Sequence, residues 1–74
     1  MDTNADFSIH TPMGRVSAVS GPHPDLPQIS THWIEIAGMP RRMPQGGVDT
    51  YANRHCAVFA AKCLARRLER ENGL

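Results

Sequence analysis

The chain has 74 residues and a net charge of +1, from eight basic and seven acidic residues. A chain of this length forms a single domain, 1–74, whose small core leaves little room for a deep substrate pocket. The charge is unevenly placed, because residues 1–39 hold one basic and four acidic residues whereas residues 40–74 hold seven and three. This asymmetry fits an anionic partner for the second half or attraction between the halves, of which we favour attraction.

The sequence shows no targeting or membrane-spanning segment. The acidic start MDTNADFSIH is unlike a signal or transit peptide. The longest apolar run, Cys56 to Ala61, is six residues long, far below the ~20 needed to cross a bilayer. Two cysteines without an export signal favour a reducing compartment. We therefore expect a cytoplasmic protein that does not enter a membrane.

Residues 1–5 are polar and are expected to be frayed, and residues 6–38 read as a β region. The alternation of Phe7 and Ile9 with polar residues predicts a strand, and Thr11-Pro12-Met13-Gly14 suits a tight turn. A hairpin results, with Val16 and Val19 on the returning strand. Their odd spacing predicts a bulge or an early end in that strand.

Three prolines make GPHPDLPQ an extended loop. ISTHWIEIAG is then the clearest strand of the chain, because it is rich in β-branched and aromatic residues. Ile34 and Ile36 fall on one face of this strand, and Trp33 and Glu35 fall on the other. Gly38 ends it.

The second half of the chain predicts a loop and one long helix. Residues 39–47, MPRRMPQGG, form the loop, and good helix formers run from about 48 to 72. Asp49 or Thr50 is the expected helix cap. The predicted fold is therefore α+β: a small antiparallel β-sheet of two or three strands followed by one long C-terminal α-helix, about 48–72.

The middle of this helix is apolar around more than half of its circumference, which is wider than a surface helix needs. One stripe holds Ala57, Ala61, Leu64 and Leu68. A neighbouring stripe is centred on the two cysteines. One flank can lie on the sheet, and the other can meet a second copy, giving a homodimer, or another protein. The residues expected in the core or in a dimer seam are Ala52, Cys56, Phe59, Ala60, Cys63 and Leu64.

The two cysteines, Cys56 and Cys63, lie seven residues apart, which is ~10.5 Å along a helix. This distance prevents a disulfide within one helix and prevents both thiolates from binding one metal ion. The histidines are scattered and form no ligand motif. We expect no metal and no cofactor, and we interpret both thiols as small apolar residues of the core or the seam.

No catalytic motif is visible in the sequence. It lacks a glycine-rich phosphate loop, a paired-histidine metal helix, a CxxC pair and a G-x-S-x-G elbow. His55 adjoins Cys56, but neighbours one residue apart on a helix do not face each other. We therefore predict that the protein is not an enzyme.

The feature that we favour for function is GMPRRMPQGG, because arginine and methionine are enriched in protein interfaces and a stiff loop loses little entropy on docking. We expect a small non-enzymatic regulator of the inhibitor or adaptor type, as bacteria and phages encode, acting stoichiometrically on a protein partner. The predicted partner-binding residues are Met39, Arg41, Arg42, Met43, Arg66, Arg67 and Arg70.

Two alternatives stay open. The basic second half could bind nucleic acid, although no aromatic residue interleaves the helix arginines and acidic residues interrupt them. A module stabilised or made catalytic by a metal held on histidine and cysteine is the third hypothesis, for which His10, His23 and His32 would have to join the thiols.

Overall fold

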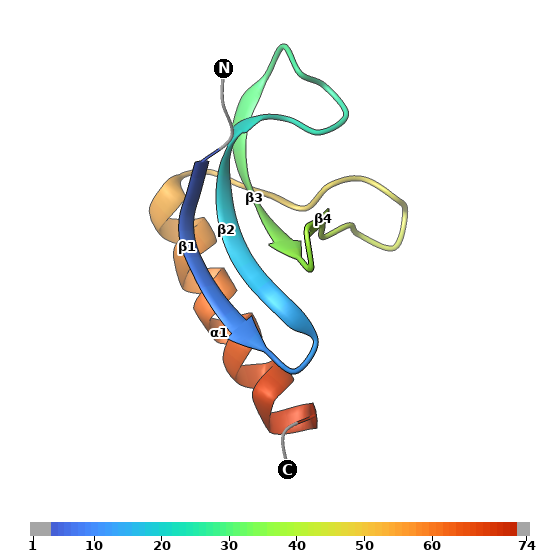
Figure 1. Cartoon of the computed structure of the whole chain (residues 1–74). Helices are drawn as coiled ribbons and strands as arrows, with labels where there is room; N and C mark the ends of the chain where they lie inside the picture. Colours follow the sequence, from blue (N-terminus) through green and yellow to red (C-terminus); the bar gives the residue numbers. More distant parts are fainter. Residues whose placement is uncertain (1–3, 73–74) are drawn as a thin grey trace.

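A computed structural model of the chain describes residues 4–72. It has an antiparallel β-sheet followed by one C-terminal helix, which confirms the α+β class, with more strands than the two or three expected. Figure 1 shows α1 lying along one face of the sheet, behind β1 and β2. The elements in chain order are β1 Asn4–Thr11, β2 Gly14–Pro22, β3 Ser30–Ile36, β4 Met39–Pro40, β5 Thr50–Tyr51 and α1 Arg54–Asn72.

The predicted hairpin is confirmed, and it is β1 and β2, which turn between Thr11 and Gly14. The Thr11 hydroxyl donates to the Gly14 carbonyl at 2.6 Å and accepts from the Met13 amide at 3.2 Å. Gly14 takes a φ of 110°, a conformation that side chains disfavour. The hydroxyl therefore fixes the turn from within.

The expected bulge lies in the other strand of this hairpin. The register shifts between Ala5 and Phe7 on β1, so that the extra residue is on β1 and not on β2. Asn4 and Ala5 pair with β2, which corrects the expected fraying of these two residues; residues 1–3 lie outside the described part of the chain.

The odd spacing of Val16 and Val19 has a different cause from a bulge in β2. Val16 and Ala18 face α1, whereas Val19 faces the opposite side of the sheet, and all three are buried. β2 packs against α1 on one face and, at Val19, with Trp33 and Val48 on the other, so buried apolar residues occur on both faces of this strand.

The side chains of β3 alternate between the two faces of the sheet as predicted, and those on each face belong to a separate hydrophobic cluster. Ile34 belongs to the main core between sheet and helix, whereas Trp33, only 2% exposed, packs with Val19 and Val48 on the far face. The Trp33 indole N–H donates to Glu35 Oε2 at 3.1 Å. The main core consists of Val16, Ala18, Ile34, Ala57, Ala61 and Leu64.

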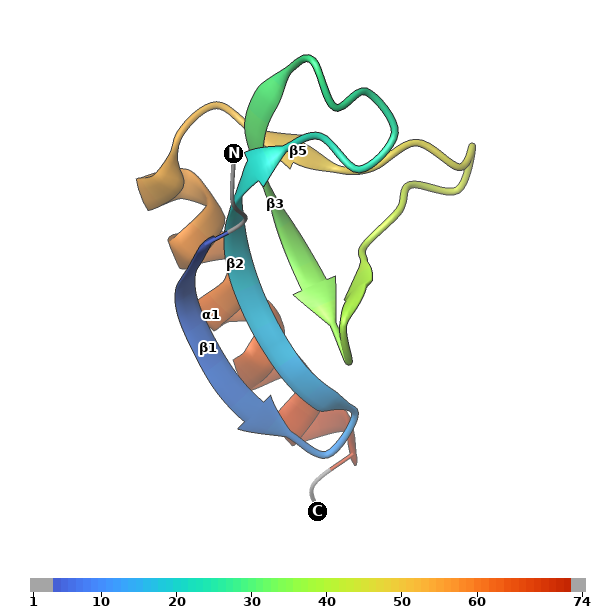
Figure 2. The same ribbon diagram turned by 45° about the horizontal axis from the view of Figure 1, so that its top comes forward.

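The fourth strand is split into two short pieces along the same edge of β3. β4 pairs with the end of β3, and β5 pairs with its first half, as Figure 2 shows for β5. The Arg41 amide donates to the Ile34 carbonyl at 2.8 Å, and the Asp49 amide donates to the Arg41 carbonyl at 3.1 Å. The chain therefore leaves the sheet after Arg41 and rejoins it at Asp49. The expected loop 39–47 is in this way partly strand, and a bridge joins Arg42 to Val48.

The helix begins at Arg54 and not at about 48. Val48 is needed in the far-face cluster, and Thr50 and Tyr51 are needed in β5, so tertiary contacts outweigh helix propensity there. Neither Asp49 nor Thr50 caps the helix. Asn53 does, because its Oδ1 accepts from the Cys56 amide at 2.9 Å, as an N-cap residue does.

Candidate docking pocket

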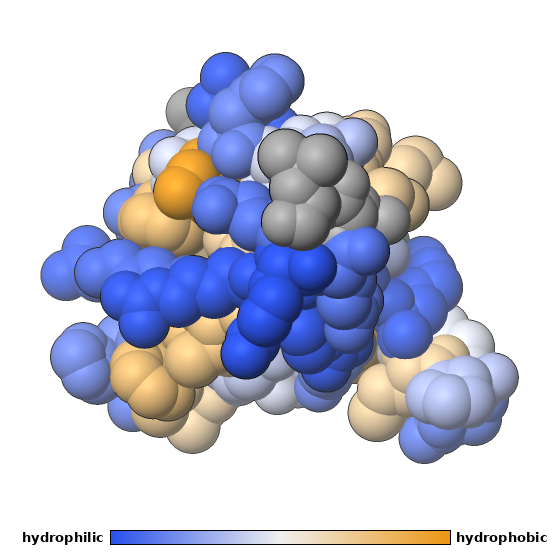
Figure 3. All heavy atoms as spheres, turned by 90° about the horizontal axis from the view of Figure 1, so that it is seen from below, coloured by the Kyte–Doolittle hydropathy of each residue, from blue (hydrophilic) through white to orange (hydrophobic). Residues whose placement is uncertain are grey.

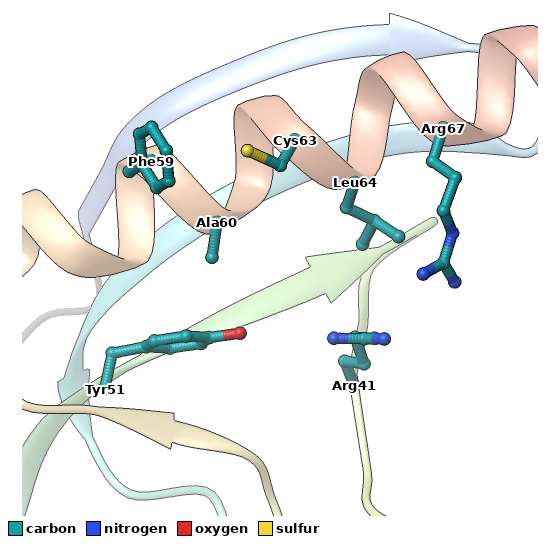
Figure 4. A pocket seen from close by; sticks show the side chains of 7 residues that line it. All are labelled: Arg41, Tyr51, Phe59, Ala60, Cys63, Leu64 and Arg67. Carbon is teal, nitrogen blue, oxygen red and sulfur yellow. The ribbon is translucent and has the colours of Figure 1, made fainter.

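An open pocket of about 290 Å³ lies between α1 and the split fourth strand. We call it the helix–strand pocket. Figure 4 shows side chains of α1 on one side of it and side chains of the split strand on the other. Its lining residues are Arg41, Tyr51, Phe59, Ala60, Cys63, Leu64 and Arg67.

The helix wall follows from the helical period. Ala60, Cys63, Leu64 and Arg67 recur at three- and four-residue steps, which places them on one side of α1. The small side chain of Ala60 leaves the hollow open, while Leu64 is buried against the core. Phe59 stands at the rim with 65% of its surface exposed. A helix that packs mainly through alanine thus leaves an apolar hollow beside it.

Tyr51 of β5 forms the strand side of the pocket. In Figure 4 its ring lies beneath Ala60 and its hydroxyl points in the direction of Arg41. Burial raises the pKa of the Tyr51 phenol, and the negative charge of Asp49 raises it further. The phenol therefore stays protonated at neutral pH, and its hydroxyl already interacts with Asp49 and Arg41.

Two arginines mark one end of the pocket. Figure 4 shows the guanidinium groups of Arg41 and Arg67 turned toward one another beside Leu64. Arg41 Nη1 lies 3.7 Å from Asp49 Oδ2, and Arg67 Nε lies 3.6 Å from Glu71 Oε2. Both distances exceed the 2.7–3.2 Å of a good N–H···O hydrogen bond. The two guanidinium groups therefore keep donors for another anion.

The pocket brings together six residues that the sequence placed in two different sets. Two were predicted as partner-binding arginines and four as core or seam residues, and they are Arg41, Arg67, Phe59, Ala60, Cys63 and Leu64. Tyr51 was missed because it fell inside the expected helix. Its β-propensity, beside Val48 and Thr50, was the available signal.

Seven predicted site residues lie outside this pocket. They are Met39, Arg42, Met43, Arg66, Arg70, Ala52 and Cys56. Met39 is 69% exposed and Met43 is also exposed. Arg66 and Arg70 are exposed on α1. Seen from the end where α1 finishes, hydrophilic residues form a band with apolar patches on either side (Figure 3).

Of the two interpretations of the cysteines, core or seam, the core interpretation is wrong. Cys56 and Cys63 are free thiols with exposed side chains, and Ala52 is exposed too. The buried stripe is the neighbouring one, Ala57, Ala61 and Leu64, with Ala65. The core needed only one of the two apolar flanks of the helix. The seam interpretation of the cysteines stays a prediction.

Arg42 joins the two proline-containing loops. Its guanidinium donates to both carboxylate oxygens of Asp25, at 2.8 Å and 3.0 Å, and to the Gly46 carbonyl at 2.8 Å. The hydrogen bonds from Arg42 hold the pKa of the Asp25 carboxyl below its usual value. This residue was predicted to bind a partner, but its donors already serve a contact within the chain.

A hydrogen-bonded chain of three polar residues crosses β1, β2 and β3. The Ser20 hydroxyl donates to Asp6 Oδ2 and lies 2.7 Å from His32 Nδ1. Since Ser20 has one proton, His32 Nδ1 must be the donor to its oxygen. A catalytic triad needs the imidazole between carboxylate and hydroxyl, so this order does not activate Ser20. The sequence offered no spacing signal for this group.

No other known protein guides the assignment of this site. Comparison with protein-family models, with curated proteins and with solved structures finds no match for this chain.

Within residues 4–72, no group of three or more histidine, cysteine, aspartate or glutamate side chains is placed to hold a metal ion. No helix in the same part of the chain is long and apolar enough to cross a membrane.

Proposed function

We propose that the protein is a non-enzymatic regulator that acts by binding a protein partner in stoichiometric amount through the helix–strand pocket. The observation that carries this proposal is the composition of the pocket: an exposed phenylalanine and a leucine wall beside two arginines with free donors. Aromatic residues and arginines are the side chains that most often dominate binding energy at protein interfaces.

The chemistry of the lining supports binding over catalysis. Its polar groups are two guanidiniums, a thiol and a phenol whose pKa is raised. Arginine stays protonated in proteins and serves as a fixed donor. The two guanidiniums and the phenol can therefore orient an anion, and they do not exchange protons at neutral pH.

Capture of a partner by matched variants tests this function. Phe59→Glu and Arg67→Glu should each abolish capture, because both residues line the pocket. Met13→Glu and Arg66→Glu are the matched controls, since they place a glutamate at exposed apolar and basic positions outside the pocket. Circular dichroism checks that all four variants fold. Equal capture by Arg67→Glu and Arg66→Glu would contradict the proposal.

Nucleic-acid binding is the second candidate, and one observation favours it. The fold places Phe59 and Tyr51 beside Arg41 and Arg67, an arrangement of aromatic and basic side chains that stacks and neutralises single strands. Binding of a labelled oligonucleotide that weakens steeply with salt, and that Phe59→Glu removes, would support this candidate.

A second copy of the chain is a further candidate partner for the outward face of α1, where Cys56, Phe59 and Cys63 lie. Doubling a small core stabilises a domain of this size. Native mass spectrometry in reductant measures the mass of the assembly directly.

A further inference from the structure

The helix–strand pocket has an apolar part and a basic end, and this polarity limits what can fill it. Tyr51, Ala60 and Leu64 form the apolar part. Arg41 and Arg67 lie together at the basic end. We infer that the occupant is a peptide segment of the partner carrying an apolar side chain and, close to it, a carboxylate. This inference rests on the proposed function and specifies the partner chemistry.

The two guanidiniums favour a carboxylate over a neutral polar group. Their present anionic neighbours are at 3.7 Å and 3.6 Å and belong to exposed side chains, so these ion pairs are weak and screened by water. A carboxylate between the two arginines could accept charge-assisted hydrogen bonds from both, and arginine matches the planar geometry of that group. The net positive charge of residues 40–74 steers an acidic segment to the same place.

The size of the pocket favours side chains over a long ligand. A volume of about 290 Å³ lies at the small end of ligand pockets and suits one or two side chains. Ala60 and Arg67 are seven residues apart on α1, about 10.5 Å along the helix axis. The carboxylate and the apolar side chain must therefore lie within about 10 Å, which is three residues of extended chain or two turns of helix.

The broken edge of the sheet argues that side chains, and not a backbone ladder, provide recognition. β4 and β5 have two residues each, and residues 42–48 leave the edge between them. A peptide added as a strand would find an interrupted row of backbone partners there. The pocket between the edge and α1 is continuous, so an occupant gains more from its side chains.

Selection from a random peptide library tests the inference. The bait is the full chain carrying Cys56→Ser, so that Cys63, which lines the pocket, is the only thiol. Bulky maleimide modification of Cys63 should block binding of the selected peptides. The matched control is Cys63→Ser modified at Cys56, which lies outside the pocket and should bind normally.

The expected peptides pair aspartate or glutamate with leucine, isoleucine, methionine or phenylalanine. Changing the acidic residue to its amide should weaken binding about tenfold or more, as for loss of a charge-assisted hydrogen bond. Arg41→Gln together with Arg67→Gln should remove that discrimination, whereas Arg66→Gln should keep it.

The outcomes separate the inference from the function. If Cys63 modification blocks the selected peptides but the amide change does not weaken them, the inferred need for a carboxylate is wrong. The pocket then remains a docking site. The absence of any peptide sensitive to Cys63 modification would overturn both the inference and the function. Salt-sensitive oligonucleotide binding blocked at Cys63, without peptide binding, would replace both with the nucleic-acid candidate.

Discussion

Ser20 shows how one hydroxyl can hold three strands together. It lies between Asp6 on β1 and His32 on β3, and bonds to both. Because the site is partly buried, the carboxylate and the imidazole both depend on this one hydroxyl for a hydrogen bond. The bulge at Asp6 is the reason that the contact can form, because it displaces that carboxylate from the regular pairing of the strand.

Ser20→Ala should destabilise the protein by about 1–2 kcal/mol, because two polar groups lose their common partner. Urea unfolding measures the change. Ser17→Ala is the matched control: Ser17 pairs with Ser8 at 3.2 Å in an exposed contact on the same strand, and its loss should cost less than about 0.5 kcal/mol. Equal effects of the two substitutions would contradict the bridging role.

Asn53 is the residue that starts the helix, and its substitution separates the observed cap from the expected ones. Asn53→Ala should cost about 1 kcal/mol, and Asn53→Asp should restore most of it, because a carboxylate also caps. Thr50→Ala, at an exposed position that was one of the two expected caps, should change the free energy of unfolding by less than about 0.5 kcal/mol. A larger loss of stability from Thr50→Ala than from Asn53→Ala would mean that the helix starts before Arg54.

At the scale of elements, the contact between two loops depends on one ion pair. Asp25 and Arg42 are 17 residues apart and join the loop after β2 to the excursion between β4 and β5. The pKa of Asp25 is lowered, chiefly by the hydrogen bonds from Arg42. The contact is therefore fully present above the usual value of 3.8 and is lost as the pH falls through the lower, folded-state value.

Arg42→Gln should accordingly raise the titration midpoint of the Asp25 carboxyl toward 3.8. Carbon-13 NMR of the carboxyl group follows this titration directly. Arg15→Gln is the control, because Arg15 bonds Ser8 on another part of the sheet and should leave Asp25 unchanged. An unaltered midpoint in Arg42→Gln would mean that the two loops are not joined in solution.

The elements that could be predicted from the sequence are those with local signals. The turn at Thr11–Gly14 and the alternation around Trp33 specify the hairpin and β3. The start of the helix could not be predicted, because Thr50 and Tyr51 pair with Trp33 and His32 on the edge of β3, which lie 17 and 19 residues away in sequence. Local propensity cannot register such a partner.

The same reasoning explains the outcome for the site. Helical spacing correctly grouped Ala60, Cys63 and Leu64, because that pattern is local. Which apolar flank faces the sheet depends on the sheet's own small residues, such as Ala18, so helical spacing alone left open whether the cysteines lie in the core or in a seam. The position of Arg41 opposite Arg67 depends on the split strand and had no local signal.

At the scale of the whole molecule, the charge asymmetry is used only in part within the fold. Among the ion pairs of the described residues, the one between Arg42 and Asp25 joins the acidic first part to the basic second part. The other two, Arg41 with Asp49 and Arg67 with Glu71, lie within the second part. Attraction between the parts was the favoured explanation, and it accounts for one of the three pairs.

The exposure of both thiols gives a test of how the molecule exists in solution. Cys56 and Cys63 should each react with Ellman's reagent in the folded, dilute protein at a rate close to that of the urea-unfolded chain, because both are exposed. Absorbance of the released thiolate gives rate and stoichiometry. Protection that grows with protein concentration would instead indicate the helix–helix seam, and protection at every concentration would contradict the exposed positions.

The split fourth strand also has a meaning for how the chain can vary in length. Residues 42–48 depart from and return to adjacent points of one edge, since the Asp49 amide is bonded to the Arg41 carbonyl. The backbone hydrogen bonds of β4 and β5 to β3 form without residues 42–48. Extra residues at the exposed tip, around Gln45 and Gly46, therefore need not shift any strand. That tip offers an internal insertion point for a fluorescent tag four residues after Arg41 in sequence, which leaves both ends of the chain unlabelled.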